Sequence, residues 1–556
     1  MLTGTCRFVT ALLLAFGLAA AVGVATAQDA QSAPTAPGLS FAALEAAGAR
    51  VGEVRIRTED IFDTRDPRED KWLFRWANTL HVQTRPGVIR RALLFKSGEP
   101  LSLRLIEETE RLLRSNRTLY DVQIKPVAYR DGVVDIEVST RDTWSLDAGL
   151  SAGRSGGANS SGIQLREQNL FGTGTTISVA RLKNVDRSSN QVQFSNDRAF
   201  GGWTALSLSH ASNSDGKRNA AAIVQPFYAL DARWSAGLSA VDDDRLDATY
   251  NAGNIVSQYR HRQALAEAFA GWSPGLVDGW VQRYSVGLAY SKSAYATEAG
   301  LAAPTTLPSD EKLVAPFIRV ALIEDRFDRE LNRNLIGRPE FFALGLAASA
   351  QLGWASAGTG SSRNALLYAG AVSRGFEPVP DHTLMAAAHI TGQYADGLVR
   401  RQRLGAQAQY YGPQGLSKGA QWLFYAAASG DMLTRADPAD ALLLGGDNGL
   451  RGYPLRYQSG TRRVLFTAEE RFYTDLYVWR LFRVGGAAFF DAGRAWAGDN
   501  PNAVNPGWLS NAGAGLRIVS ARAAFSNVLH VDIALPLNTT AGMKKLQLLV
   551  KTKTSF

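Results

Sequence analysis

Hydrophobic and polar residues alternate with a period of two along most of the chain, from residue 143 to residue 556. The alternating segments are about ten residues long, and turn-forming glycine, asparagine, aspartate, serine and proline residues separate them. In NVLHVDIALPL, the odd-numbered residues from Leu529 to Leu537 are aliphatic, whereas His530 and Asp532 are polar. Because successive strand residues point to opposite faces, each segment presents one apolar face and one polar face.

This length and spacing predict a mainly β protein with a transmembrane antiparallel β-barrel over residues 143–556, rather than a soluble β-sandwich. Candidate strands number about twenty, and an even count is expected for a bacterial barrel. The final segment, KLQLLVKTKTSF, places Lys551 and Lys553 on one face. Lysine is costly on a lipid-facing surface, so this face is predicted to line the lumen. Residues 144–153 and 546–556 are expected to be the first and last strands, which close the barrel.

Residues 51–142 follow a different pattern, which predicts a small α+β domain. VGEVRIR alternates as a strand does, whereas VIRRALLF and SLRLIEETERLLRSN have the spacing of amphipathic helices. Two further alternating runs flank Asp131-Gly132, a strong signal for a β-hairpin. The predicted order of elements is β-α-α-β-β.

The N-terminus has the pattern of a secretory signal peptide. Arg7 precedes an apolar run at residues 9–24, and Ala25-Thr26-Ala27 forms a small-x-small cleavage site, which predicts a signal peptide over residues 1–27. Residues 28–50 are rich in alanine and proline and are predicted to form a flexible leader.

Composition and charge narrow the class of protein further. No apolar stretch after the signal peptide reaches the length of a transmembrane helix. The formal net charge is +9, but basic and acidic residues are interspersed and no nucleic-acid-binding motif is present, which argues against nucleic-acid binding. The only cysteine, Cys6, lies in the predicted signal peptide, so no disulfide or zinc-thiolate site is expected in the mature chain.

One glycine-rich stretch, GGDNGLRGY at residues 445–453, contains a single arginine, Arg451. Its spacing matches neither a P-loop nor a dinucleotide-binding fingerprint, and a strand-like run follows it instead of a helix. In the next two segments the period of two directs Glu469, Arg471 and Asp491 toward the lumen. Because a guanidinium offers a rigid fork of donors, Arg451 is predicted to form ion pairs with the carboxylates of Glu469 and Asp491.

Two glycines beside Arg451, Gly449 and Gly452, are predicted to let this loop fold back sharply. Glycine adopts backbone angles that are forbidden to other residues, and a sharp return of the chain requires such angles. The stretch is therefore interpreted as a loop that carries its arginine into the barrel.

Three motifs in this part of the chain resemble those of one known family. LRGY at 450–453, AEERF at 468–472 and FFDAG at 489–493 resemble the loop and strand motifs of the BamA/TamA-type outer-membrane assembly and translocation superfamily. The resemblance implies that Asp491 holds Arg451 inside the barrel and that Glu469 is a second acidic contact. It also implies site roles for the remaining motif residues, which are Gly452, Tyr453 and Gly493.

The same resemblance implies a barrel of sixteen strands and a C-terminal β-signal that ends at Phe556. In the N-terminal part, GVIRRALLFKSGEPLS, RLLRSNRTLYDVQI and DGVVDIEVSTRDTW resemble a polypeptide-transport-associated (POTRA) domain, which implies that residues 51–142 lie in the periplasm. The segment at residues 58–84 is longer and more charged than is usual in that family.

No catalytic site or metal site is predicted. GLSAG at 149–153 matches G-x-S-x-G, but it lies in an alternating run without the strand-turn-helix that a nucleophile elbow requires. The six histidines form no close ligand pair, and the acidic run at 241–247 lacks the EF-hand spacing. The protein is therefore expected not to be an enzyme and to use no cofactor.

The resemblance implies a protein of the outer membrane of a Gram-negative bacterium that inserts or translocates unfolded client polypeptides. Its other expected partners are outer-membrane lipids and accessory periplasmic or lipoprotein subunits. The alternative is a two-partner-secretion transporter that exports one dedicated protein, although such transporters usually carry two POTRA domains and a plug helix. Residues 51–142 argue against a passive porin, and the lack of a placed Ser/His pair argues against an outer-membrane lipase.

Overall fold

The computed structural model describes residues 40–417, 420–437, 440–496, 505–524, 528–539 and 543–553. Three predicted features lie outside these residues, namely the signal peptide at 1–27, the leader up to residue 39, and the terminal Phe556.

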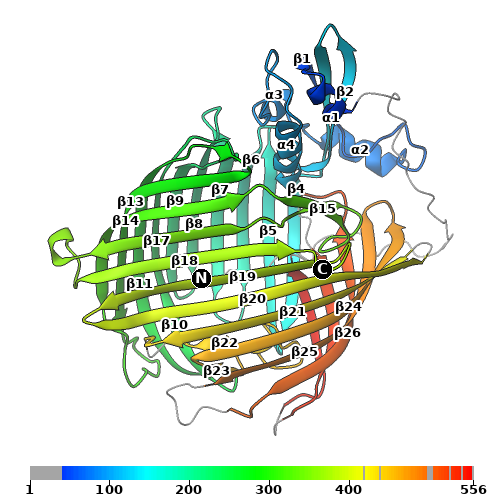
Figure 1. Ribbon diagram of the computed structural model, residues 1–556. Coiled ribbons are helices and arrows are strands. Elements are labelled where there is room, and N and C mark those ends of the chain that lie inside the picture. The colour runs from blue at the N-terminus through cyan, green and yellow to red at the C-terminus, as the bar shows by residue number, and fades with distance from the viewer. Residues whose placement is uncertain are drawn as a thin grey trace.

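Twenty long strands of the described chain form one closed antiparallel barrel, in which each strand pairs with the next along the sequence (Figure 1). The first ten are β4 (Leu146–Ser155), β5 (Ala158–Leu170), β6 (Thr175–Lys183), β7 (Ser188–Ala199), β8 (Thr204–Asn213), β9 (Gly216–Gln225), β10 (Trp234–Asn251), β11 (Asn254–Trp272), β13 (Trp280–Ala296) and β14 (Glu311–Glu324). The other ten are β17 (Ala347–Ala355), β18 (Ala365–Phe376), β19 (Thr383–Ala395), β20 (Leu398–Ser417), β21 (Ala420–Thr434), β24 (Arg462–Val478), β25 (Phe482–Trp496), β26 (Leu509–Ser520), β27 (Val528–Pro536) and β28 (Gln547–Lys553).

The predicted barrel and the predicted count of about twenty strands are confirmed, whereas the sixteen strands implied by the family resemblance are wrong for this barrel. Short alternating segments belong to the barrel as fully as long ones do. Strand β6, for example, pairs along its whole length with β7. A two-residue strand, β12 (Leu276–Val277), pairs with β13 at the turn that follows β11.

The alternation in the sequence separates side chains between the two faces of the barrel wall. On β27, Ile533 and Leu535 are 51% and 50% exposed, whereas His530 and Asp532 are almost fully buried. On β28 the Lys551 amine points inward, to a loop in the lumen. The apolar face is therefore the outer, lipid-facing surface and the polar face lines the lumen, as predicted.

The N-terminal residues form a small α+β domain. Its elements are α1 (Phe41–Ala46), β1 (Arg50–Glu59), α2 (Trp72–Leu80), α3 (Pro86–Arg90), α4 (Leu103–Ser115), β2 (Leu119–Arg130) and β3 (Val133–Asp142). The sheet has the order β1-β3-β2, with β1 parallel and β2 antiparallel to β3. Helix α4 begins after the capping residue Ser102 and packs Ile106 and Leu113 against Val134 and Ile136 in the domain core.

Two helices of this domain differ from the predicted pattern. Helix α1 lies within residues 28–50, which were predicted to be a flexible leader; Ser40 caps it and Leu44 is buried in the domain core. Helix α2 lies in the long segment at residues 58–84, where Phe74 is its buried side chain. Both helices depend on contacts with distant parts of the chain, which local spacing does not reveal.

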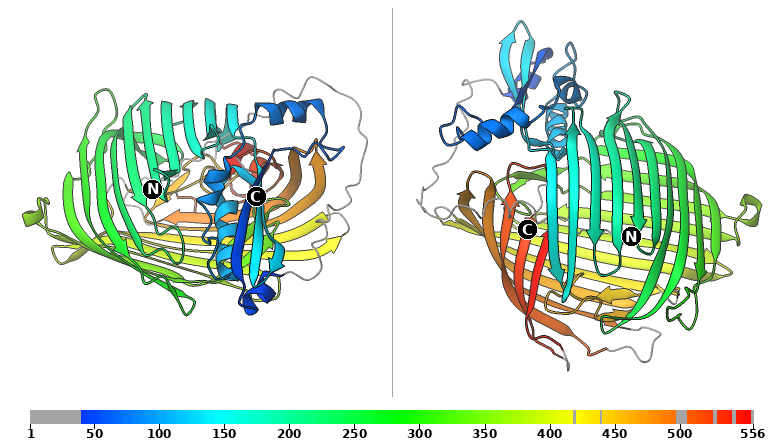
Figure 2. Two further views of the ribbon diagram at one scale, coloured as in Figure 1. Left: turned by 90° about the horizontal axis from the view of Figure 1, so that it is seen from above. Right: turned by 180° about the vertical axis from the view of Figure 1, so that it is seen from behind.

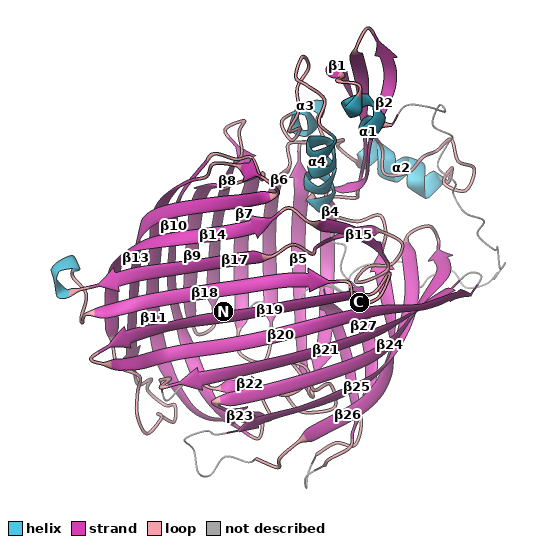
Figure 3. Cartoon of the chain, in the orientation of Figure 1, coloured by secondary structure: helices cyan, strands magenta, loops and turns pink. Residues whose placement is uncertain are grey.

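The N-terminal domain contacts the barrel at one end, here called the near end, and the opposite end is called the far end (Figure 2). Apart from a short 3-10 helix at Ala357–Thr359, the described helices belong to this domain (Figure 3). The Glu108 carboxylate accepts a hydrogen bond from the Leu230 backbone amide at 2.7 Å, and the Arg85 amide donates to the Gly172 carbonyl at 2.9 Å. No helix in the described ranges is long and apolar enough to cross a membrane.

Candidate functional site in the barrel lumen

A long loop enters the lumen from the far end, between β21 and β24. This inward loop, residues 440–461, contains a small hairpin of β22 (Leu442–Leu444) and β23 (Gln458–Gly460). Leu444, Leu450 and Tyr453 are completely buried and pack against Leu509. The loop is therefore folded onto the inner wall of the barrel.

Arg451 lies at the inner end of this loop and forms ion pairs with two carboxylates of the wall. Its Nε and one Nη donate to the two oxygens of Asp491 at 2.8 and 2.7 Å, and its other Nη donates to Glu469 at 2.6 Å. Asp491 stands on β25 and Glu469 on β24, at inward positions. The structure thus brings together Arg451, Asp491 and Glu469, which the sequence placed 40 residues apart at most.

The surroundings of this ion-pair cluster satisfy its remaining hydrogen-bonding groups. Asp491 also accepts hydrogen bonds from Thr467 at 3.0 Å and from Asn511 at 2.8 Å. The guanidinium carbon of Arg451 lies 3.4 Å from the centre of the Phe489 ring. Burial acts to lower the pKa of Arg451, but the neighbouring Asp491 and Glu469 carboxylates outweigh it and raise that pKa above its ordinary value. The arginine is therefore held as a cation.

The glycines and the tyrosine of the two motifs fit close to the wall. A Cβ on Gly452 would lie 2.6 Å from the Cβ of Asn511, and a Cβ on Gly493 would lie 2.8 Å from the Val464 carbonyl oxygen. The Tyr453 hydroxyl lies 2.9 Å from the carbonyl oxygen of Ser510. Gly452 of the loop thus lies against β26, and Gly493 of β25 lies against β24, so neither position accommodates a larger side chain.

The two glycines that were predicted to bend the loop act differently from each other. Gly449 has a φ of 127°, which other residues rarely adopt. Gly452 is not in the left-handed region; its amide donates to the Asn511 side chain at 3.1 Å. The bend predicted at Gly452 is thus corrected to a close approach between the loop and β26.

The same loop also joins the two strands at which the barrel closes, called here the seam. Within the described residues, β28 and β4 share a single register pair, Val550 with Arg154, whereas β27 and β28 share seven. The Gly446 carbonyl accepts hydrogen bonds from Ser155 of β4 and Lys551 of β28, both at 2.6 Å. The loop therefore bridges the seam from inside.

A second segment enters the lumen from the near end, and the pattern of the sequence did not predict it. This inward hairpin consists of β15 (Phe327–Leu331), a tip, and β16 (Pro339–Ala343) between β14 and β17. At its tip, Ile336 is buried against Leu423 and Val528 of the inner wall. The hairpin carries no alternation distinct from that of a barrel strand, so only its contacts identify it.

The inward hairpin and the inward loop contact the two members of one ion pair in the wall, Arg471 and Glu469 respectively. Arg471 donates to Glu469 at 2.9 Å and to the Arg333 carbonyl of the hairpin tip at 2.9 Å, and Tyr473 donates to that carbonyl at 2.9 Å. Glu469 in turn accepts from Arg451. A continuous chain of hydrogen bonds thus runs from the near-end hairpin to the far-end loop.

The structure shows neither a nucleophile elbow at the G-x-S-x-G match nor, among the described residues, a metal site. Ser151 of the GLSAG match lies within β4, in the barrel wall, and not on a turn before a helix. Among the residues that the structure describes, no group of three or more His, Cys, Asp and Glu side chains is placed to hold a metal ion.

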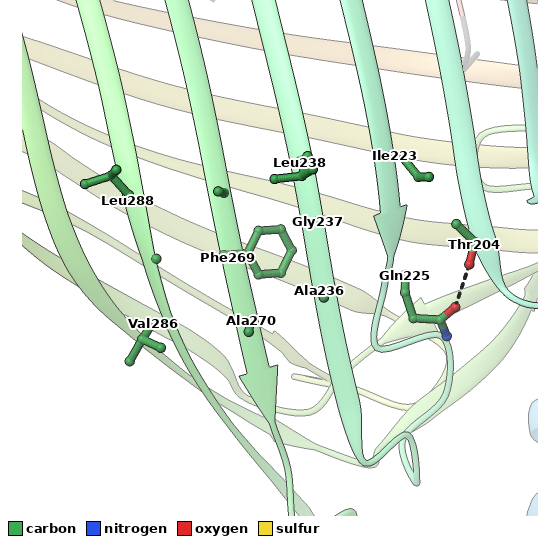
Figure 4. Close-up of a pocket in the computed structure, with 12 residues that line it drawn as sticks. Thr204, Ile223, Gln225, Ala236, Gly237, Leu238, Phe269, Ala270, Val286 and Leu288 are labelled. Atoms are coloured by element: carbon green, nitrogen blue, oxygen red, sulfur yellow. Dashed lines mark hydrogen bonds between the residues drawn. The ribbon is translucent and has the colours of Figure 1, made fainter.

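A shallow hollow of about 700 Å³ lies on the outer wall over β9, β10, β11 and β13 (Figure 4). Exposed aliphatic residues border it, among them Ile223, Leu238, Val286 and Leu288. A hydrogen bond between Thr204 and Gln225 lies at its edge. The hollow is thus apolar and lies on the outer face of the wall.

Comparison with known proteins places the barrel in a family. A model of the Omp85 superfamily domain matches residues 169–552, which is more than half of the chain. Similar solved structures include BamA from Haemophilus ducreyi lacking POTRA domains 1–3, with 13% identity, coverage of 91% of this chain and 84% of that one, and a TM-score of 0.40. They also include CdiB from Acinetobacter baumannii (13% identity, 91% and 73% coverage, TM-score 0.45) and CdiB from Escherichia coli (15%, 92% and 77%, 0.46). No curated protein matches.

Proposed function

This chain belongs to the Omp85 superfamily, and on that premise we propose that it inserts unfolded client polypeptides into the outer membrane or translocates them across it, without covalent chemistry. The observation that carries the proposal is the arginine of the inward loop, which Asp491 and Glu469 hold inside the lumen. Segments enter the lumen from both ends, the inward loop from the far end and the inward hairpin from the near end. A client pathway that opens and closes does need such a closed resting state.

The near end faces the periplasm in this proposal, and the N-terminal domain over residues 51–142 acts as a POTRA domain. Strand β2 is an edge of its three-stranded sheet and exposes Val127 and Tyr129, at 44% and 38%. An extended client segment would add to this edge through main-chain hydrogen bonds. Accessory periplasmic or lipoprotein subunits are further proposed partners of the same domain.

The weakly paired seam supports insertion, because a client strand would enter the membrane where β28 and β4 separate. The second candidate is a transporter that exports one dedicated protein through the lumen. The inward hairpin supports it because this hairpin lies in the lumen, on that route. In both cases the ion pair of Glu469 and Arg471 connects the inward hairpin, which must move, with the inward loop, which holds the barrel closed. The terminal Phe556 is proposed to be the end of the signal by which this barrel is itself inserted.

The test compares a deletion strain, a strain with Arg451→Ala and a strain with Arg326→Ala, by quantitative proteomics of outer membranes and culture medium. Arg326 forms an exposed ion pair with Glu377 and serves as the control. We expect the deletion to lower one or more barrel proteins or one secreted protein, and Arg451→Ala to lower the same proteins less severely. Arg451→Ala itself is expected to reach the outer membrane.

Two results would count against the proposal. If the deletion changed the abundance of no barrel protein and no secreted protein, both insertion and export would be wrong. If Arg451→Ala behaved as wild type, the proposed role of the arginine would be wrong while the client function stood.

A further inference from the structure

A segment of the N-terminal domain packs on the rim of the barrel at its near end. This rim segment, residues 60–84, contains α2. The rings of Phe62 and Phe74 stack at 4.0 Å, and with Ile61 they form a buried cluster against Trp144 and Leu481 of the barrel. Seen from above, α2 lies at the margin of the barrel outline and not over its middle (Figure 2).

The position of Trp144 shows the level at which the rim segment lies. Trp144 immediately precedes β4 and has the same parity as Leu146 and Leu150, which are 39% and 48% exposed on the lipid-facing wall. Two residues of extended chain span about 7 Å, so Trp144 is the next position of that outward row. The rim segment covers this position and therefore borders the lipid-facing surface directly.

Polar contacts fix the rim segment across the near end of the seam. Arg522, in the turn after β26, donates to the Ile61 carbonyl at 3.2 Å and forms a buried ion pair with Glu69. The Trp144 amide donates to the Arg522 carbonyl at 2.7 Å. The segment is thus connected to Trp144, which leads into β4, and to the turn between β26 and β27, two strands from β28.

Helix α2 exposes an apolar face that no described residue covers. Trp72, Trp76, Leu73 and Leu80 are 74%, 56%, 43% and 53% exposed. At 100° per residue these four side chains occupy one side of the helix, opposite the buried Phe74. Exposed apolar patches of this kind mark interaction sites, and tryptophan is the side chain most typical of the membrane–water boundary.

We propose that this exposed face of α2 lies in the headgroup region of the phospholipid leaflet at the near end, beside the seam. The favoured occupant is phospholipid because the face continues the lipid-facing row of β4. Exposed aromatic residues at the same end of the barrel, Trp234, Trp272 and Trp479, mark the level of the membrane boundary.

Such a contact gives α2 a role that is independent of any client. The helix would hold the N-terminal domain at a defined height and angle to the bilayer. It would also keep lipid packed against the near end of the seam, along which the described residues of β28 and β4 share a single register pair.

The proposal is tested by fluorescence quenching in vesicles. With Cys6 outside the mature chain, a single cysteine can be introduced and labelled with bimane. The full mature protein carrying Trp76→Cys is reconstituted into phosphatidylcholine vesicles, with bromines on the upper acyl carbons as the lipid quencher and iodide as the aqueous quencher. Controls are Leu150→Cys on the lipid-facing wall, Val127→Cys on the N-terminal sheet, and Arg75→Cys on the polar flank of α2.

We expect brominated lipid to remove most of the emission at positions 76 and 150, less at 75 and none at 127. Iodide should show the reverse order. Quenching at 76 by iodide alone, as at 127, would overturn the proposal. So would protection of 76 only by an added unfolded outer-membrane protein, because the face would then be a client site. Trp72→Cys provides a second labelling position, and heat-dependent mobility on gels verifies that each variant is folded.

Discussion

Arg451 makes three charge-assisted hydrogen bonds to two carboxylates. Arg245 and Arg260 make as many, but their side chains are 21% and 18% exposed, so burial sets the Arg451 cluster apart. All three partners are nearly inaccessible to solvent, since their side chains are 7%, 4% and 0% exposed. Removing one member of such a cluster leaves buried charge without compensation, which costs more than the pair itself contributes.

Arg451→Ala is therefore expected to lower the free energy of unfolding by about 3–5 kcal/mol. Arg451→Lys keeps the charge but lacks the fork that contacts both oxygens of Asp491, so its loss should be intermediate. The measurement is the urea midpoint followed by heat-dependent gel mobility. The exposed pair of Arg326 and Glu377 provides the control, because Arg326→Ala should cost no more than about 1 kcal/mol. Equal losses for the two alanine variants would contradict this account.

Gly452 gives a second expectation at this scale. In Gly452→Ala the new Cβ would meet the Cβ of Asn511 at 2.6 Å, so the loop must move away and the hydrogen bond from its amide must lengthen. We expect a loss of about 1–3 kcal/mol, the usual range for overpacking. Gly202→Ala should be close to neutral in the same unfolding assay, because no atom lies within 4 Å of its added Cβ. Similar midpoints for both variants would argue against a close fit at Gly452.

Among the larger elements, the inward hairpin has the clearest mechanical consequence. Its tip packs on the inner wall and Arg471 binds the Arg333 carbonyl. At the end of the tip, Arg338 donates to the Leu119 carbonyl of the N-terminal domain at 3.2 Å. The hairpin therefore links the domain that is proposed to receive clients with the wall residues that hold the Arg451 loop.

Replacing residues 332–338 with a short glycine-serine turn is expected to increase the ion conductance of the purified protein in planar bilayers. The physical reason is that the tip occupies space in the lumen from the near end. The control removes residues 303–306 of the loop between β13 and β14, which does not enter the hairpin cluster. An unchanged conductance after removal of the hairpin tip would show that other segments alone close the lumen.

For the molecule as a whole, the seam distinguishes the two candidate functions. Insertion needs β28 and β4 to separate, whereas export through the lumen does not. Arg154 and Val550 are direct neighbours across the seam, and such positions lie within the Cα separation that a disulfide accepts.

We therefore expect Arg154→Cys combined with Val550→Cys to form a disulfide that stops client insertion and is reversed by a reducing agent. The readout is the abundance of client barrels in the outer membrane with and without the reductant, and each single cysteine variant is the control. Persistent export of one secreted protein in the oxidised double variant would favour the transporter instead. Normal insertion through a demonstrably closed seam would rule out a lateral route.

Several features of this protein were determined by the sequence alone. The period of two determined the barrel and the inward faces of Glu469, Arg471 and Asp491, because strand parity depends only on neighbouring residues. The placement of Arg451 followed from its charge, since a buried arginine requires carboxylates and the lumen offers them nearby.

The tertiary structure alone decided the rest. Arg471 and Arg333 are 138 residues apart, and nothing in the local pattern of the hairpin distinguishes it from a barrel strand. Helix α2 lies at the rim because Phe74 packs in the cluster beside Trp144. The Gly446 carbonyl joins β4 to β28 because the inward loop returns to the seam. Such contacts depend on which segments meet in space, and a period along the chain carries no information about that.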